Sequence, residues 1–307
     1  MISGFTIVKD VLKQGYPFVE AVAASLPICD EFLISDGYST DGTFEIVQRM
    51  ANLNKKIIVS RQAWPSARRY SILSEVTNVV RKKCRFEYIL SVQANEIIHE
   101  DSVDFIRELP EICPKVNTFS FPFWHFVREY KFYEDFRLRF AKNLPSIVAT
   151  GDAWSLGPSK AFVRSEAFRS ATNPKLFLRY VGRGIELTYA NACASPISRA
   201  IYLPKPVFRY WSLSPRNYVE KSTKYASMSG LTENYKAVNT LKNYVNDLPS
   251  FWKHAAETMR AGFDFNYPDA FGVVNQKDHP RLIQDFLTGS SDSYYVRENV
   301  LDLIRSL

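Results

Sequence analysis

The stretch FLISDGYSTDGTFEIVQ, residues 32–48, decides the fold. It opens with strand-forming residues, passes through a corner of small and acidic residues, and continues with the apolar spacing of a helix. A strand, a tight corner and a helix are the repeating unit of an α/β fold. Two aspartates, Asp36 and Asp41, stand in this corner, where like charges repel and a turn needs only one of them. The corner is therefore the first candidate for a binding function.

The segments on either side continue this alternation. Apolar runs predict strands at residues 5–9, 31–35, 55–60 and 86–92, and helical spacing predicts helices at residues 16–26, 41–53, 66–83 and 100–109. Pro17 is expected in the first turn of the first helix, and Asp41 or a neighbour at the N-cap of the second. Such alternation implies right-handed crossovers and a parallel sheet with helices on both faces.

The rim of this sheet is where we expect a ligand. In an open parallel sheet, ligands bind at the carboxyl ends of the strands. Residues 36–43 and 93–96 follow the second and fourth predicted strands. The two segments are therefore expected along one rim.

After residue 115 the regular alternation stops. Shorter, aromatic-rich strands are predicted at residues 118–127, 138–142, 160–165 and 205–213, and residues 215–307 are predicted to be mostly helical. Ser214 is expected as the N-cap and Pro215 as the first residue of one of these helices. Its Arg216, Lys221 and Lys224 would lie over phosphates or meet an acidic membrane surface.

The composition indicates a globular protein with a large core, because 46% of the 307 residues are hydrophobic and 14% are aromatic. No apolar run has the roughly 20 residues that span a bilayer, and the N-terminus lacks a charged leader, so we expect a soluble cytoplasmic protein. The four cysteines have no paired spacing, which favours reduced thiols over disulfides or a zinc site.

The net charge of +7 is unevenly placed, because residues 131–230 carry +10 and the rest of the chain carries −3. A basic middle suits an anionic ligand, a phosphate-bearing substrate or an acidic membrane surface, although it also suits a solubilising face. Nucleic acid is the least favoured partner, because the basic residues are scattered and no reading motif is present.

The corner at residues 36–43 lacks the glycine patterns that grip phosphates, G-x-G-x-x-G and G-x-x-x-x-G-K-[ST]. Acidic groups suit another task, because a carboxylate accepts hydrogen bonds from a ribose diol or from the N–H of a base. Gly37 and Gly42 allow the backbone to turn and to approach a flat ligand.

The segment LISDGYSTDGT resembles the D-D-G-S-T-D-G-T loop of family 2 glycosyltransferases with the GT-A fold. In that family the loop holds the nucleotide of a sugar donor. The opening GFTIVKDVLKQGYPFVEAVAASLPICDEFLIS, the segment ILSVQANEIIHED, and the later FWHFVREYKFYEDFRLRFAKN and GDAWSLG resemble, in the same order, a bacterial and archaeal branch of these enzymes. The resemblance covers roughly residues 3–225 and implies a Rossmann-like, mostly parallel mixed sheet flanked by helices, followed by a helical C-terminal extension.

Two departures from the family pattern concern the metal. Where the family has an aspartate that holds a cation on the donor's diphosphate, this chain has Asn95, a weaker ligand for Mg²⁺ or Mn²⁺. Where the family has a histidine near the end of the domain, this chain has Arg209, which cannot ligate a cation. A guanidinium can instead neutralise the leaving diphosphate. We therefore expect little or no metal dependence, with Glu96 as a remaining carboxylate for residual Mn²⁺ or Mg²⁺.

The resemblance also implies roles for other residues. Asp152 in the GDAWSLG turn is the first choice for the general base of an inverting transfer, although a turn aspartate that bonds its own backbone explains it equally well. Glu129, Glu134 and Asp135 are reserves, although such a cluster is usually a solvated face.

Further residues are assigned to the two substrates. Asp36, Gly37, Asp41, Arg68, Gln93, Asn95 and Arg209 are expected at the nucleotide-sugar donor, with a different polar partner on the nucleotide for each of the two aspartates. Trp154 and His125 are expected at the acceptor, although His125 also suits a satisfied core position.

The sequence thus predicts a glycosyltransferase domain at residues 1–228, with a nucleotide-binding half at 1–115 and an acceptor half at 116–228, and a helical extension at 229–307. It would transfer a sugar from a nucleotide-sugar donor to a hydroxyl of a glycan or lipid-linked acceptor, in the cytoplasm or at the membrane surface. The alternative is a catalytically degenerate relative that binds a nucleotide sugar or a glycan without turnover.

Overall fold

The computed structural model describes most of the chain. The described residues are 1–65, 71–150, 153, 155–159, 198–211, 213–229, 241–244, 246–262, 271–289 and 294–307. Every structural statement below concerns these residues.

The N-terminal half is a parallel sheet built from the four predicted strands. These are β1 (Ile2–Val8), β2 (Glu31–Asp36), β3 (Ile57–Arg61) and β4 (Tyr88–Ser91). β1 lies between β2 and β4, and β2 pairs with β3, all in parallel. Because the strands run in the same direction, their carboxyl ends meet at one rim, as predicted.

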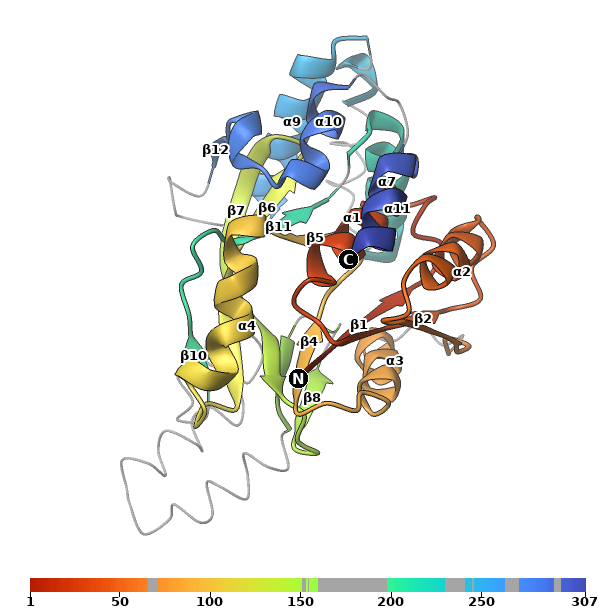
Figure 1. Ribbon diagram of the computed structural model, residues 1–307. Coiled ribbons are helices and arrows are strands. Elements are labelled where there is room, and N and C mark those ends of the chain that lie inside the picture. The colour runs from red at the N-terminus through yellow and green to blue at the C-terminus, as the bar shows by residue number, and fades with distance from the viewer. Residues whose placement is uncertain are drawn as a thin grey trace.

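Four helices connect or follow these strands: α1 (Phe18–Ser25), α2 (Thr43–Leu53), α3 (Ile72–Arg81) and α4 (Val103–Ile112). Alternate residues of β2 enter two separate cores, since Phe32 and Ile34 pack in the core that holds α1 and α2, whereas Leu33 packs in the core that holds α3. Both faces of the sheet are therefore covered (Figure 1), which explains why these strands are apolar along their whole length.

The second half extends the same sheet with strands of both directions. Its strands are β5 (Glu96–Ile98), β6 (Thr118–Val127), β7 (Tyr130–Lys142), β10 (Ser198–Ala200), β11 (Val207–Tyr210) and β12 (Gly272–Val273). The main path of the sheet runs β3-β2-β1-β4-β7-β6-β11-β5, and β8 (Ile147–Thr150) and β9 (Ser155–Pro158) form a separate antiparallel pair. The predicted α/β class is confirmed. The sheet is mixed, its first half is parallel, and helices flank it.

The C-terminal region is helical, as predicted, with α7 (Pro215–Ser229), α9 (Leu248–Gly262), α10 (Arg281–Thr288) and α11 (Glu298–Ser306). α11 lies against α1 and α2 (Figure 1) and adds Val300, Leu301 and Ile304 to their core. The Asn54 side-chain amide donates to the Ile304 carbonyl at 2.8 Å. α11 therefore packs on helices α1 and α2, whereas α9 lies against β6 and β7. The predicted division after residue 228 stays a proposal.

The helix starts predicted at residues 16, 41 and 215 hold to within two residues, whereas α3 begins at Ile72 rather than at residue 66, and α4 begins at Val103 after a 3-10 turn at Glu100–Ser102. Pro17 is the residue before α1 and not in its first turn, and Gly42 is the N-cap of α2, where its φ of 92° requires glycine. Pro215 opens α7 as predicted, and the Ser214 hydroxyl accepts a hydrogen bond from the Asn217 N–H at 3.3 Å.

Candidate functional site

The corner after β2 is fixed by its own chain. Asp36 is completely buried and accepts hydrogen bonds from the Ser39 N–H at 3.2 Å and from the Arg61 Nε at 2.9 Å. The Gly37 N–H donates to the Val8 carbonyl at 2.7 Å, which ties the end of β2 to the end of β1. The negative charge of Asp36 is thus balanced by an arginine at the end of β3.

Asp41 joins this corner to the loop after β1. One carboxylate oxygen accepts from the Thr43 N–H at 3.0 Å and the other from the Lys13 N–H at 2.8 Å. Asp10 reaches back in the other direction, since its carboxylate accepts from the Thr40 N–H at 2.8 Å. The two aspartates of the corner therefore have separate partners inside the chain, which answers how their charges tolerate so tight a turn. Their expected contacts with a nucleotide stay a prediction.

Arg61 is a residue of this rim that sequence reasoning missed. Its guanidinium lies 4.4 Å from the centre of the Tyr38 ring and 3.9 Å from that of Phe44. Tyr38 is 54% exposed and adopts a φ of 59°, a conformation that a tyrosine rarely takes. The available signal was the position of Arg61 as the last residue of the third strand, on the rim that the alternation predicts.

Gly37 has a packing reason to be glycine. A Cβ at this position would lie 2.7 Å from the Trp64 Nε1 and 3.0 Å from the Lys9 side chain. The Trp64 Nε1 is buried without a hydrogen-bond partner among the described residues. The rim therefore holds a tightly packed aromatic side chain with an unused donor beside the corner.

Asn95 is used to join β5 to β11. Its side-chain amide donates to the Tyr210 carbonyl at 2.9 Å, and the Tyr210 N–H donates to the Asn95 carbonyl at 2.9 Å. Gln93, just before it, donates from its side chain to the Ala153 carbonyl at 3.2 Å. Both residues thus lie where they were predicted, after β4, with partners inside the chain.

Glu96 is bound to an arginine. It is 1% exposed, and its two oxygens accept from Arg139 Nη2 at 2.6 Å and from Arg139 Nε at 2.8 Å. Burial alone raises the pKa of this carboxyl, but the charge and hydrogen bonds of Arg139, with a contribution from Arg209, outweigh burial and hold the pKa below its usual range. Glu96 is therefore an ionised carboxylate whose charge is already matched.

The described residues do not fit a divalent cation. A cation at Glu96 would have to displace Arg139 and would meet the guanidinium of Arg209, whose Nε lies 4.0 Å from a Glu96 oxygen. Within the described part of the chain, no group of three histidines, cysteines or acidic residues lies close enough to hold a metal ion. The arrangement of Glu96 thus disagrees with its predicted use as a metal ligand, because its charge is matched by arginine.

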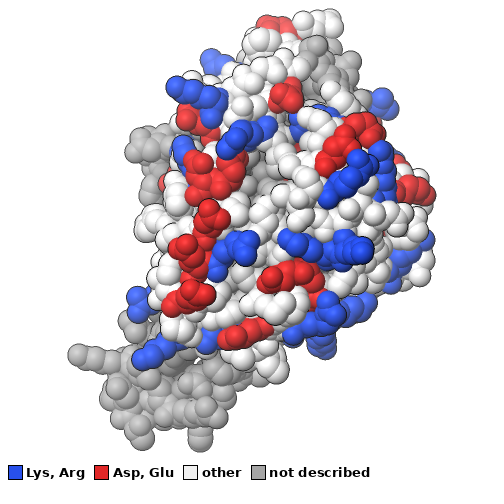
Figure 2. Space-filling model, in the orientation of Figure 1, with Lys and Arg blue, Asp and Glu red and all other residues white. Residues whose placement is uncertain are grey.

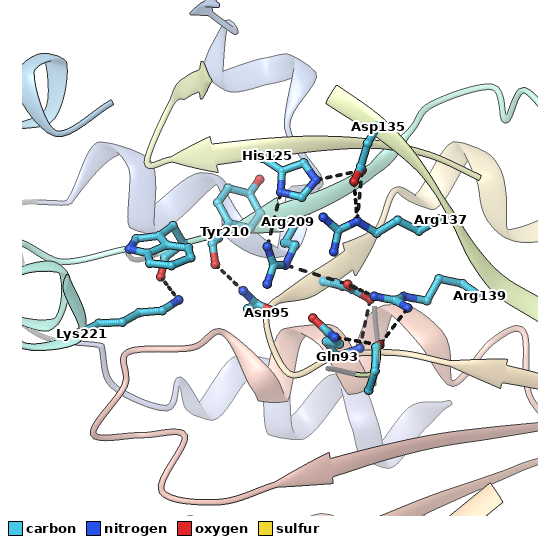
Figure 3. Close-up of polar contacts among 12 residues, drawn as sticks. Gln93, Asn95, His125, Asp135, Arg137, Arg139, Arg209, Tyr210 and Lys221 are labelled. Carbon is cyan, nitrogen blue, oxygen red and sulfur yellow. Dashed lines mark hydrogen bonds and ion pairs between the residues drawn. The ribbon is translucent and has the colours of Figure 1, made fainter. Parts of the chain in front are cut away.

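Four side chains of β6, β7 and β11 form a polar chain above this pair (Figure 3). His125 Nε2 lies 3.0 Å from an Asp135 oxygen, and Asp135 accepts from Arg137 Nε at 2.8 Å. On its other side, His125 Nδ1 lies 3.4 Å from Arg209 Nη1. Burial lowers the pKa of His125 to about 4, so its imidazole is neutral at neutral pH.

This arrangement differs from the predicted contact of His125 with an acceptor. The side chain is 2% exposed and both of its ring nitrogens have partners in the chain. The structure favours the alternative of a satisfied, buried histidine. Asp135 also differs from the solvated face considered for it, because only 13% of its side chain is exposed.

Three arginines and two acidic side chains meet in this cluster. Its cations are Arg137, Arg139 and Arg209, and its anions are Glu96 and Asp135. Guanidiniums that converge in this way present planar sets of N–H donors, which suit an anionic ligand.

The residue that follows the predicted general base Asp152 in the sequence contacts this cluster. The Ala153 carbonyl, one residue after Asp152, accepts from both Gln93 and Arg139. Asp152 itself, Trp154 and Arg68 lie outside the described residues. The predicted roles of these three residues stay proposals.

Lys221 of α7 has partners inside the chain, and its predicted role at phosphates or at a membrane stays a prediction. Its ammonium donates to the Trp211 carbonyl at 2.8 Å and lies 3.7 Å from the centre of the Trp211 ring. Burial, with a contribution from Arg209, lowers its pKa. Arg216 is exposed and pairs with Glu220 at 3.3 Å.

Acidic and basic side chains are interspersed on the face that Figure 2 shows, and neither sign of charge forms a continuous stripe there. Residues 160–197, which hold much of the predicted basic middle, lie outside the described part. No helix among the described residues is both long and apolar enough to span a membrane.

No protein-family model and no curated protein matches this chain. Solved glycosyltransferase structures resemble it weakly. S. aureus TarS 1–349 in complex with UDP-GlcNAc is 18% identical over 41% of this chain and 34% of that one, with a TM-score of 0.29. The same protein in complex with UDP is 14% identical over 86% and 72%, with a TM-score of 0.35.

A mannosyltransferase from Pyrobaculum calidifontis, in complex with GDP-Man and Mn²⁺, is 13% identical over 88% of this chain and 76% of that one, with a TM-score of 0.35. This chain thus spans about a third of the TarS chain in the first match and about three quarters of the protein in the other two. At these TM-scores the likenesses assign no role to any residue of this chain.

Proposed function

We propose that this protein is a glycosyltransferase that takes its sugar from a nucleotide-sugar donor and binds the donor's diphosphate with arginine in place of a metal ion. The observation that supports this proposal most is the convergence of three guanidiniums, those of Arg137, Arg139 and Arg209, at the end of the rim that begins with the corner at residues 36–43. The resemblance of the corner to a donor-binding loop points to the same ligand.

In this proposal the nucleoside lies at the corner after β2. Asp36 and Asp41 hold the shape of the corner through their bonds to Arg61 and to the loop after β1, and their remaining acceptor positions face the nucleoside. Gly37, Gln93 and Arg68 complete the donor site. The exposed ring of Tyr38 is available for stacking on the base.

Arg209 supplies the charge at the diphosphate. Its guanidinium adjoins Glu96 and His125, and it offers donors in a planar fork that matches phosphate oxygens. As the bond from the sugar to the diphosphate breaks, negative charge grows on the leaving diphosphate, and a fixed cation stabilises it. Asn95 holds the strand of Arg209 in register with β5.

Asp152 is proposed as the general base that removes the proton from the acceptor hydroxyl in an inverting transfer. Trp154 would lie against the acceptor, a glycan or a lipid-linked sugar. The proximity of Ala153 to Gln93 and Arg139 supports this assignment, because Ala153 directly follows Asp152 in the sequence.

A second candidate is a protein that binds a nucleotide sugar or a glycan without turnover. The observation that favours it is the pairing of Asn95 and Glu96 within the chain, which leaves neither of them as a ready ligand for the cation that related enzymes use. It predicts diphosphate binding without any release of sugar from the donor.

The first experiment is calorimetry with UDP, GDP, CDP and dTDP, each in Mn²⁺ and again in EDTA. We expect one diphosphate to bind equally well in EDTA, and Arg209→Ala to weaken this binding by about tenfold or more, because a charge-assisted bond is lost. Arg216→Ala is the matched control, since Arg216 is exposed and pairs only with Glu220 among the described residues.

The matching nucleotide sugar is then incubated with candidate acceptors, and free nucleoside diphosphate is measured. Turnover in EDTA supports the enzyme, and binding without turnover supports the second candidate. If none of the four diphosphates binds with or without Mn²⁺, the proposed donor site is wrong.

A further inference from the structure

The hydrogen bonds of His125 determine where its proton is. An arginine N–H can only donate, so Nδ1, which faces Arg209 Nη1 at 3.4 Å, must be the acceptor. Nε2 must then carry the proton, and it faces an Asp135 oxygen at 3.0 Å that can accept it. One neutral tautomer satisfies both contacts, whereas the other tautomer and the charged ring would each direct an N–H at Arg209.

We infer that His125 is a positioning residue, a neutral imidazole that Asp135 holds in its Nε2–H form so that Nδ1 orients the guanidinium of Arg209 toward the diphosphate. This inference rests on the proposed function, because it assigns Arg209 the diphosphate as its ligand. It adds a chain of three residues, Asp135 to His125 to Arg209, from the middle of β7 across β6 to β11.

The surroundings of His125 keep it in this state. The ring is 2% exposed and packs against Phe132 and Tyr133, whose ring centres lie 6.0 and 5.0 Å away. The charged or titratable groups that face it are Asp135, Tyr133 and Arg137 from β7 and Arg209 from β11. Burial and the two arginines oppose protonation more strongly than Asp135 favours it.

Asp135 is itself fixed, because it accepts from Arg137 Nε through both oxygens, at 3.0 and 2.8 Å. Burial opposes ionisation of Asp135, but the hydrogen bonds from His125 and Arg137 and the charge of Arg137 outweigh it and hold the pKa of Asp135 below its usual range. An ionised Asp135 can only accept, so it selects the Nε2–H form of His125. Asp135 thereby determines the orientation of Arg209 through the hydrogen bonds of His125, which lies between them.

Two substitutions separate this role from simple packing. His125→Asn keeps an oxygen near the position of Nδ1 and so keeps an acceptor for Arg209, but it loses ring volume. His125→Phe keeps the ring in its aromatic surroundings but removes the acceptor. A packing role predicts that Phe is the milder change in every measurement, whereas a positioning role predicts that Asn is the milder change for ligand affinity.

The probe is inorganic pyrophosphate in EDTA at neutral pH, measured by calorimetry. We expect His125→Asn to bind within about threefold of the wild-type chain and His125→Phe to bind about tenfold more weakly, as for a lost bond to a charged group. His99→Phe is the control, because His99 is also buried but its Nδ1 accepts from the Asp101 N–H. It should leave pyrophosphate affinity unchanged.

The tautomer is read from the ¹⁵N signals of the imidazoles. The chain has four histidines, so the signal missing from His125→Phe identifies His125. We expect a neutral Nε2–H pattern at neutral pH, and a shift of the Nδ1 signal in Arg209→Ala. A charged ring, an Nδ1–H pattern, or a Phe variant that binds as tightly as the Asn variant overturns the inference. If the wild-type chain binds neither pyrophosphate nor any of the four nucleoside diphosphates, the proposed function fails, and the imidazole signals still decide the state of His125.

Discussion

Glu96 is the residue on which the arginine cluster depends most. Its carboxylate is buried and bonded twice by Arg139, with Arg209 nearby. Glu96→Gln would leave the guanidinium of Arg139 buried without its counter-charge, and breaking such a pair destabilises a protein by about 3–5 kcal/mol. We expect a loss of unfolding free energy of this order in urea denaturation.

The control for this variant is Glu298→Gln, because Glu298 pairs with Arg49 at the surface, where 68% of its side chain is exposed. An exposed pair contributes little, so this change should leave the urea midpoint almost unchanged. Equal midpoints for the two variants would show that Arg139 does not need Glu96, and the view of Glu96 as a structural counter-ion would then be wrong.

Single residues were predicted well where their position follows from strand order and poorly where it follows from packing. The rim positions of Asp36, Gln93 and Asn95 follow from the alternation, and each lies just after its predicted strand. The partners of Asp135 could not be predicted, because alternation along a strand does not reveal which side chains face it from β6. The sequence shows that the segment RLRFAKN is basic, but only the folded structure shows that its Arg139 bonds Glu96.

At the scale of elements, the loops after β1 and β2 act as one unit. Asp41 joins them by accepting two backbone N–H groups with two different oxygens. Asp41→Asn has only one such oxygen and would turn an N–H toward another donor, so we expect a loss of about 1 kcal/mol of stability. Urea denaturation measures this change.

The matched control lies in the same pair of loops. Asp10 uses one oxygen for the Thr40 N–H and hydroxyl, and an asparagine oxygen can accept both. Asn also tolerates the φ of 49° at this position. Asp10→Asn should therefore match the wild-type chain, and an equally stable Asp41→Asn would contradict the joining role. Diphosphate calorimetry on the same two variants tests whether the corner also contacts the nucleotide.

The elements that were predicted are those with long periodic patterns. The four strands and the helices of the first half have apolar runs or helical spacing that their burial explains. β5 has only three residues and begins at Glu96, the last residue of the segment at 93–96, so no pattern separates it from a loop. Among the described strands, β8 and β9 pair only with each other, and each has four residues, which is too short for a clear alternation.

At the scale of the molecule, the last helices are connected to the first one by buried charge. Glu20 in α1 accepts from the Tyr294 hydroxyl at 2.8 Å and pairs with Arg297 at 3.4 Å. Burial raises the pKa of Glu20 more than Arg297 and Tyr294 lower it. The sequence predicted helices here but not this connection, because nothing in a local pattern pairs residues 277 positions apart.

The stability of the whole molecule should fall in mild acid because of two buried histidines. Burial lowers the pKa of His125 and of His279 to about 4, below the ordinary value of 6.5. As the pH falls from about 6.5 to 4, these histidines bind protons in the unfolded chain but stay neutral in the folded chain. Their contribution to the free energy of unfolding is therefore complete above about pH 6.5 and is lost between about pH 6.5 and 4, by up to about 3 kcal/mol for each histidine. Glu20, with its raised pKa, acts in the opposite sense, since its folded form gains stability by holding a proton.

Urea denaturation at a series of pH values measures the slope of the free energy of unfolding against pH. His125→Asn should reduce this slope by up to about one proton. If the variant shows the same slope as the wild-type chain, His125 is not the buried neutral residue on which the orientation of Arg209 depends.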